Sequence, residues 1–192
     1  MTTVIDIAIE PLTRDSFAPY GQLIAAGDGA PDYARPTLDV WHLDYASDAP
    51  FRIQIMRYSH KPMMFSRLER HLCVTEGRLP LNGAMSVLAV AGATLGAGGD
   101  MPDPSTVRAF LLDGSSGLIF KPGVWHSLDC FPLAPPYVDY ALLSDVATEN
   151  EIEAGGSKAP DARTNVVDYA ARGLEFHIVD SNNVLSNTPA AG

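Results

Sequence analysis

One segment, residues 67–76, constrains the fold and the chemistry of this chain more than any other. It places Glu69, His71 and Glu76 in a pattern typical of a β-strand followed by a turn and a second strand. Glu69 and His71 are two residues apart, so on a strand their side chains point to the same face. A second histidine, His126, follows the turn residues Pro122 and Gly123 and begins another strand. Two strand-borne clusters, each with an imidazole, indicate a polar pocket inside a small β-barrel.

The rest of the chain has the residue pattern of an all-β domain. Thr13 is a good cap for a short N-terminal helix that stops near Gly21. Segments rich in Gly, Pro and Asp separate short runs of apolar and β-branched residues, and many short strands at such spacing are typical of a sandwich or barrel. The predicted strands are residues 4–9, 38–45, 51–58, 64–71, 86–91, 107–112, 118–121, 125–130 and 138–143.

The composition changes after this series, and we predict two regions. Residues 1–153 form the barrel domain, and residues 154–192 form a C-terminal extension that is partly docked onto it. Within the extension, residues 174–179 have the pattern of one more strand or of a docking tail. Residues 181–192 are expected to be disordered.

Charge and composition exclude several classes of partner. The net charge is −10 and the sequence has no basic run, so nothing would neutralise the phosphates of nucleic acid or an anionic membrane. The two cysteines are too few for a disulfide scaffold. The N-terminus does not have the pattern of a signal peptide, and no apolar run is long enough to span a membrane. We therefore expect a cytoplasmic enzyme or binding domain.

Two imidazoles and two carboxylates on rigid strands can perform two kinds of chemistry. Glu69, His71, Glu76 and His126 could hold one divalent metal such as Mn, Ni, Zn or Fe, because neutral histidine and carboxylate suit first-row metals. Histidine is also the side chain that is most easily poised for proton transfer near neutral pH. The alternative for His71 alone is a structural histidine that donates to a backbone carbonyl.

These motifs resemble those of the cupin superfamily. Glu69-x-His71, four residues, Glu76, six residues and Gly83 are similar to the first cupin motif, with Glu69 where metal-binding cupins usually have histidine. Lys121-Pro-Gly-x-x-His126 is similar to the second motif, with Lys121 at its proline position. Within that superfamily, residues 9–153 resemble the ureidoglycolate lyase family. The residues that carry this resemblance are 68–71, 80–83, 107–110, Asp113, Gly114, Gly117 and 124–126, with an opening like 11–21.

The resemblance implies a fold and an activity. The fold would be a cupin-type antiparallel β-barrel, also called a double-stranded β-helix or jelly roll, in a homodimer. The activity would be a carbon–nitrogen lyase that cleaves (S)-ureidoglycolate to glyoxylate and urea in purine and allantoin catabolism. The chain departs from the family pattern at Lys121-Pro122, at Ser127 and at Val146, where the family tends to carry other polar or basic residues.

The resemblance and the residues together assign roles. His126 or Glu76 would be the catalytic base, and His71 would deliver a proton or hold a metal. Arg57 or Lys121 would bind the carboxylate of a small anionic substrate. Arg70 is out of phase with Glu69 and His71, so it should face away from the pocket. Two alternatives stay open: another small-acid or sugar-acid cupin enzyme (an isomerase, dehydratase or dioxygenase), and a ligand-binding cupin without catalysis.

Overall fold

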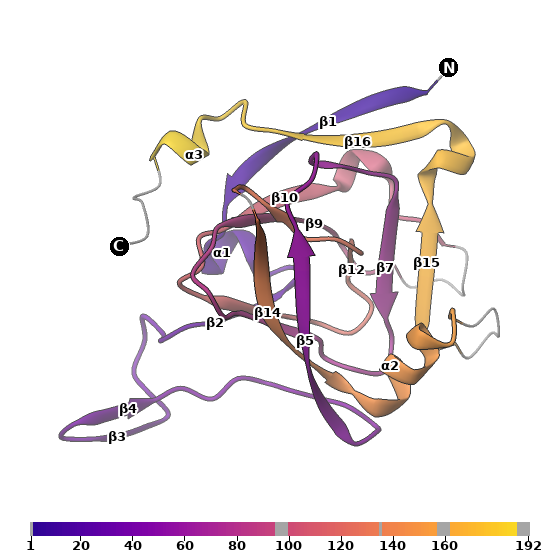
Figure 1. Cartoon of the computed structure of the whole chain (residues 1–192). Helices are drawn as coiled ribbons and strands as arrows, with labels where there is room; N and C mark the ends of the chain where they lie inside the picture. Colours follow the sequence, from indigo (N-terminus) through magenta and orange to yellow (C-terminus); the bar gives the residue numbers. More distant parts are fainter. Residues whose placement is uncertain (1, 95–99, 135, 157–161, 188–192) are drawn as a thin grey trace.

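Two curved sheets form the body of the protein (Figure 1). The computed structural model describes residues 2–94, 100–134, 136–156 and 162–187. The larger sheet has the strand order β15-β7-β12-β9-β10-β1-β16-β6, with β13 paired to β9, and the smaller sheet has the order β2-β11-β8-β14-β5. Strands β3 and β4 form a separate hairpin that projects from the body in Figure 1. The all-β, cupin-type barrel with a short N-terminal helix that the sequence predicts is therefore confirmed.

The strands of the larger sheet are β1 (Thr3–Pro11), β6 (Met64–Phe65), β7 (Arg67–His71), β9 (Ser86–Ala91), β10 (Arg108–Leu112), β12 (Trp125–Ser127), β13 (Phe131–Pro132), β15 (Thr164–Asp168) and β16 (Leu174–Val179). Those of the smaller sheet are β2 (Gly21–Ile24), β5 (Phe51–Ser59), β8 (Gly77–Pro80), β11 (Gly117–Phe120) and β14 (Tyr137–Asp145). The hairpin is β3 (Tyr33–Arg35) and β4 (Leu38–Val40). The helices are α1 (Arg14–Phe17), η1 (Pro104–Thr106), α2 (Val146–Glu153), η2 (Tyr169–Arg172) and α3 (Val184–Asn187).

Strand β9 explains how the core is divided, because every one of its residues is buried. Val87, Ala89 and Ala91 pack into one apolar cluster, while Leu88 and Val90 pack into another on the opposite face. A strand that is buried on both faces reads as a continuous apolar run. The first cluster lies under β1, β15 and β16, and the second fills the space between the two sheets.

The segment after residue 153 adds two strands to the larger sheet. Strand β15 pairs antiparallel with β7, and β16 pairs parallel with β1. Its side chains Val167, Tyr169 and Phe176 belong to the first apolar cluster. The segment 174–179, for which the sequence left a strand or a docking tail open, is thus strand β16.

Several local predictions are corrected. The predicted strand 38–45 is formed only over β4, and the predicted strand 64–71 is interrupted at Ser66 between β6 and β7. The barrel is not antiparallel throughout, because β1 runs parallel to both β10 and β16.

The chain end is also more ordered than expected. Residues 184–187 form helix α3, because the Asp180 carboxylate accepts hydrogen bonds from the backbone N–H groups of Val184 (2.7 Å) and Leu185 (3.3 Å). The prediction of disorder for 188–192 lies outside the described residues. Within the described ranges, no helix combines the length and the apolar character needed to cross a membrane.

Arg163, which directly precedes β15, connects that strand to the start of helix α2 through hydrogen bonds. Its guanidinium donates to the Asp145 carboxylate (2.9 Å) and to the Thr148 hydroxyl (3.1 Å), and it also contacts Asp48. Asp145 is fully buried and caps α2 by accepting from the Thr148 N–H. Burial alone would raise the pKa of Asp145, but hydrogen bonds from Ser47 and Thr148 and the charge of Arg163 lower that pKa.

Arg163→Ala should therefore destabilise the fold, because it leaves a buried carboxylate without its cation. We expect the free energy of unfolding in guanidinium chloride to fall by about 1.5–3 kcal/mol, the range for a hydrogen bond to a charged group. Arg35→Ala, at an exposed position of the β3–β4 hairpin, is the control. Equal stability of the two variants would contradict this role for Arg163.

Candidate active site

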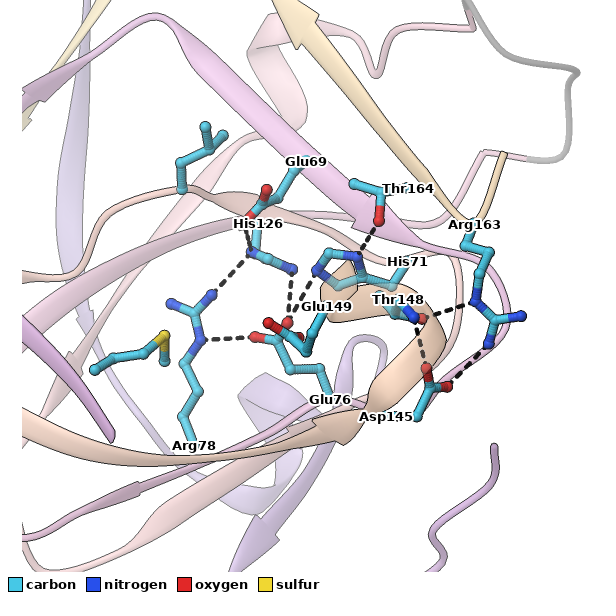
Figure 2. Close-up of polar contacts among 12 residues, drawn as sticks. Glu69, His71, Glu76, Arg78, His126, Asp145, Thr148, Glu149, Arg163 and Thr164 are labelled. Atoms are coloured by element: carbon cyan, nitrogen blue, oxygen red, sulfur yellow. Dashed lines mark hydrogen bonds and ion pairs between the residues drawn. The ribbon is translucent and has the colours of Figure 1, made fainter. Parts of the chain in front are cut away.

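Two strands and a turn bring the predicted residues to one point inside the barrel (Figure 2). His126 on β12 is directly opposite Glu69 on β7. Leu68 belongs to the apolar cluster on the other face of the sheet, so alternation along β7 turns Glu69 and His71 inward. Glu76 lies in the turn between β7 and β8. The structure therefore brings Glu69, His71, Glu76 and His126 together.

Glu76 is the centre of the polar contacts. One carboxylate oxygen accepts a hydrogen bond from Nε of Arg78 (2.8 Å), and the other lies 2.9 Å from Nε2 of His71. Glu76, Arg78 and His71 are only 2–4 % exposed. Nδ1 of His71 lies 3.0 Å from the Thr164 hydroxyl of strand β15. The His71 ring thus has the Thr164 hydroxyl at Nδ1 and, as an ion-pair partner, the Glu76 carboxylate at Nε2.

His126 lies beside this group and is held differently. Its ring stacks on Phe120, with centroids 4.7 Å apart and planes 17° apart, and its centroid is 5.2 Å from that of His71. Nδ1 lies 3.2 Å from the Ser127 carbonyl oxygen and 3.3 Å from a guanidinium nitrogen of Arg78. Nε2 is buried, and within the described ranges it has no hydrogen-bond partner; the nearest Glu76 oxygen is 3.9 Å away. Nε2 is thus free to meet a ligand.

The two imidazoles have pKa values displaced in opposite directions. Burial alone would lower the pKa of His71, but the hydrogen bond to Glu76 and the charges of Glu76 and Glu69 raise it. Burial lowers the pKa of His126 to about 3, and the positive charges of Arg78 and His71 add to this effect. His71 therefore holds a proton more strongly than a free imidazole does, whereas His126 is neutral at neutral pH.

The pKa values of the two carboxylates are also displaced in opposite directions. Burial would raise the pKa of Glu76, but the charge of Arg78 and the two histidines hold it well below its usual range. Burial raises the pKa of Glu69. Groups whose environments push their pKa values apart are typical of sites that transfer protons.

The two predicted substrate anchors do not join this cluster. Arg57 lies on the outer face of β5, where its side chain is 57 % exposed, pairs with both oxygens of Asp139 (2.8 Å each) and covers the ring of Tyr137. Lys121 is exposed and donates to the Ala18 carbonyl (2.7 Å).

Lys121 does line a cavity of about 240 Å³ with Gln22, Asp44 and Phe120. Phe120 separates that cavity from the His126 ring. Arg70 faces away from the site, as predicted, and its guanidinium lies over the Trp125 ring.

Sequence reasoning missed three polar residues of the site. Arg78 lies two residues after Glu76, so alternation along β8 could have placed its side chain beside Glu76. Glu149 on α2 is buried and belongs to none of the recognised motifs. Thr164 reaches His71 only because β15 pairs with β7, a pairing that no local sequence signal indicates.

Part of the cluster fits a divalent metal. One ligand atom each from Glu69, His71 and His126 lies within 4.8 Å of the others. Two imidazoles and one carboxylate form a donor set that suits first-row transition metals, and the unpartnered Nε2 of His126 is compatible with ligation. Glu76, the fourth predicted ligand, is outside this group, and its two oxygens contact Arg78 and His71.

Comparison with known proteins assigns the family. The sequence pattern of the family described as ureidoglycolate lyase matches residues 4–160. The chain belongs to the ureidoglycolate lyase family. Ureidoglycolate lyases of Pseudomonas aeruginosa (strain PAO1) and of Pseudomonas syringae pv. tomato are 32 % and 34 % identical to it. These matches cover 62 % of this chain and 73 % and 72 % of the two relatives.

Among solved structures, RmlC from Streptococcus suis in complex with dTDP-D-xylose is 10 % identical, with a TM-score of 0.33. That match covers 50 % of this chain and 44 % of the other.

Arg78 is the arginine that faces the cluster, so its replacement should affect the binding of a small carboxylate. We expect Arg78→Lys to weaken glycolate binding, measured by isothermal titration calorimetry, by about ten- to a hundredfold, because a charge-assisted, forked contact is lost. Arg57→Lys makes the same change on the outer face and should leave the affinity unaltered. A larger loss in Arg57→Lys would restore Arg57 as the anchor.

Proposed function

We propose that this member of the ureidoglycolate lyase family cleaves (S)-ureidoglycolate to glyoxylate and urea, as a carbon–nitrogen lyase of purine and allantoin catabolism. Family membership supports the lyase class. The observation that carries the proposal is the pair of buried imidazoles, whose ring centroids are 5.2 Å apart, with the pKa of His71 raised and that of His126 lowered.

The reaction needs one proton removed and one delivered. A base takes the proton from the substrate hydroxyl, the carbon–oxygen bond becomes the carbonyl of glyoxylate, and the carbon–nitrogen bond breaks. The departing nitrogen takes up a proton and leaves as urea. A neutral imidazole and an imidazolium side by side can perform these two transfers, and each proton transfer typically contributes about a hundred- to ten-thousand-fold.

His126 suits the role of base. The Ser127 carbonyl and the Glu69 carboxylate (3.8 Å) both lie near Nδ1 and can only accept, whereas Arg78 can only donate. The tautomer with its proton on Nδ1 donates to the Ser127 carbonyl, 3.2 Å away, and faces the Glu69 carboxylate, so Nδ1 does not accept from Arg78. Nε2 then has a free lone pair, which can accept the hydroxyl proton.

His71 suits the role of acid. As an imidazolium it donates from Nε2 to Glu76 and from Nδ1 to the Thr164 hydroxyl. Glu76 stabilises that charged form, and the proton on Nε2 is the one available to the leaving nitrogen. Glu76, assigned by sequence as an alternative base, is better suited to holding His71, because both of its oxygens are engaged.

Arg78 is suited to bind the carboxylate of the substrate. Its Nη1 atom is buried and, within the part of the chain that the structure describes, has no hydrogen-bond partner. A guanidinium can bind a carboxylate through two parallel N–H groups. The small anionic substrate would thus be anchored beside His126 and not at Arg57 or Lys121.

A divalent metal, if bound, would be held by Glu69, His71 and His126, and it would polarise the substrate hydroxyl and lower its pKa. The residues would still orient the substrate through Arg78. Assembly as a homodimer and a cytoplasmic location stay predictions.

The proposal is tested by measuring urea and glyoxylate released from (S)-ureidoglycolate, with and without added Mn, Ni, Zn or Fe. Wild-type protein should release the two products in equal amounts, and His126→Ala should reduce kcat by about a hundred- to ten-thousand-fold. His42→Ala, at an exposed histidine, should retain activity. If wild-type protein releases no urea under any of these conditions, the proposal is wrong, and another small-acid enzyme becomes the leading alternative.

A further inference from the structure

Glu149 is a buried carboxylate with only one of its oxygens satisfied. It lies on helix α2 and is 5 % exposed. Oε2 accepts a hydrogen bond from the side-chain amide of Gln54 (2.7 Å), whereas Oε1 has no hydrogen-bond partner among the described residues. A buried polar atom without a partner costs free energy, so its persistence suggests that a ligand supplies the missing donor.

The helix holds this carboxylate in a fixed position. At the start of α2, the Thr148 N–H donates to Asp145 (2.7 Å) and the Val146 N–H donates to the Pro50 carbonyl (2.9 Å). Towards its end, the Glu151 carboxylate accepts from the backbone N–H groups of Arg163 (3.1 Å) and Thr164 (2.7 Å). Glu149 is thus carried by an element that is tied to β14 on one side and to β15 on the other.

The carboxylate faces the same cluster as the two imidazoles. Figure 2 draws Glu149 in the same region of the barrel as Glu76 and His71. Its charge is the smallest of the causes that act on the pKa values of His71 and Glu69, and it raises both. The oxygens of Glu76 are already engaged by Arg78 and His71. Oε1 of Glu149 is therefore an acceptor that remains open for a ligand.

The chemistry of the two open groups is complementary. Nη1 of Arg78 is a cationic donor, which suits a carboxylate, and Oε1 of Glu149 is an anionic acceptor, which repels one. An anionic acceptor accepts from N–H and O–H groups, and a ureido group presents N–H donors on both of its nitrogens. A hydroxy acid without nitrogen has only its hydroxyl, whose proton faces His126 in the proposed reaction.

We propose that Glu149, held by Gln54, accepts hydrogen bonds from the ureido N–H groups of the substrate and makes the site selective for ureido acids. This inference rests on the proposed lyase function. It assigns a partner to the ureido end of the substrate, whereas Arg78 binds the carboxylate end of the same molecule. Glu149 acts here in binding and selectivity and carries no step of proton transfer.

The inference is tested by calorimetric binding of two small acids that the enzyme cannot cleave. N-carbamoylglycine has the ureido group but no hydroxyl, and glycolate has the hydroxyl but no ureido group. Glu149→Leu should weaken binding of N-carbamoylglycine by about ten- to a hundredfold, the range for a hydrogen bond to a charged group, and leave glycolate binding unchanged. Glu149→Gln should lose less, because the amide oxygen can still accept.

Glu153→Gln is the matched control, since it removes the same charge from an exposed position of the same helix. It should bind both acids as wild type does. Parallel loss of both ligands in Glu149→Leu and Glu149→Gln would mean that Glu149 only supports the fold, and would contradict the inference. Wild-type protein that does not bind N-carbamoylglycine would contradict it as well.

Because binding is measured without turnover, the two proposals can fail separately. Selective loss of N-carbamoylglycine in Glu149→Leu supports the role of Glu149 even if wild-type protein releases no urea, an outcome that would overturn only the lyase reaction. Urea release by wild type with unchanged binding in Glu149→Leu would overturn only the role of Glu149.

Discussion

The buried ion pair between Glu76 and Arg78 is the contact on which the rest of the site depends. A buried charge is tolerated only with good partners, and removing one partner leaves the other uncompensated. Glu76 has two such partners, Arg78 at 2.8 Å and His71 at 2.9 Å. One carboxylate therefore fixes the guanidinium that we propose binds the substrate and raises the pKa of an imidazole, while Arg78 helps to keep the neighbouring His126 neutral.

The fold supplies the rigidity that this arrangement needs. Strand β9 is buried on both faces, so the larger sheet separates an outer apolar cluster from the cluster inside the barrel. In the segment after residue 153, β16 covers the outer apolar cluster and β15 pairs with β7. Strand β15 also carries Thr164, which holds Nδ1 of His71. The C-terminal segment thus contributes to the site as well as to the core.

Strand alternation and motif spacing were enough to predict the fold and the convergence of Glu69, His71, Glu76 and His126. The same rule failed for Arg57, because alternation says which residues share a face but not which face is inside. Ile53 and Ile55 lie on the same face of β5 as Arg57 and, although apolar, are 60 % and 65 % exposed, whereas Met56 and Tyr58 pack inward. Glu149 could not be predicted, because its position depends on how α2 is fastened between β14 and β15.

The pH dependence of kcat/KM for urea release shows whether Glu76 makes His71 the acid of the proposed reaction. In the proposed reaction the charged form of His71 is the active one, so kcat/KM should fall as the pH rises through its raised pKa. In Glu76→Gln the carboxylate charge that raises this pKa is gone, so the fall should move to lower pH. Glu153→Gln should keep the wild-type profile. A Glu76→Gln profile with its alkaline fall at the wild-type pH would contradict this role of Glu76.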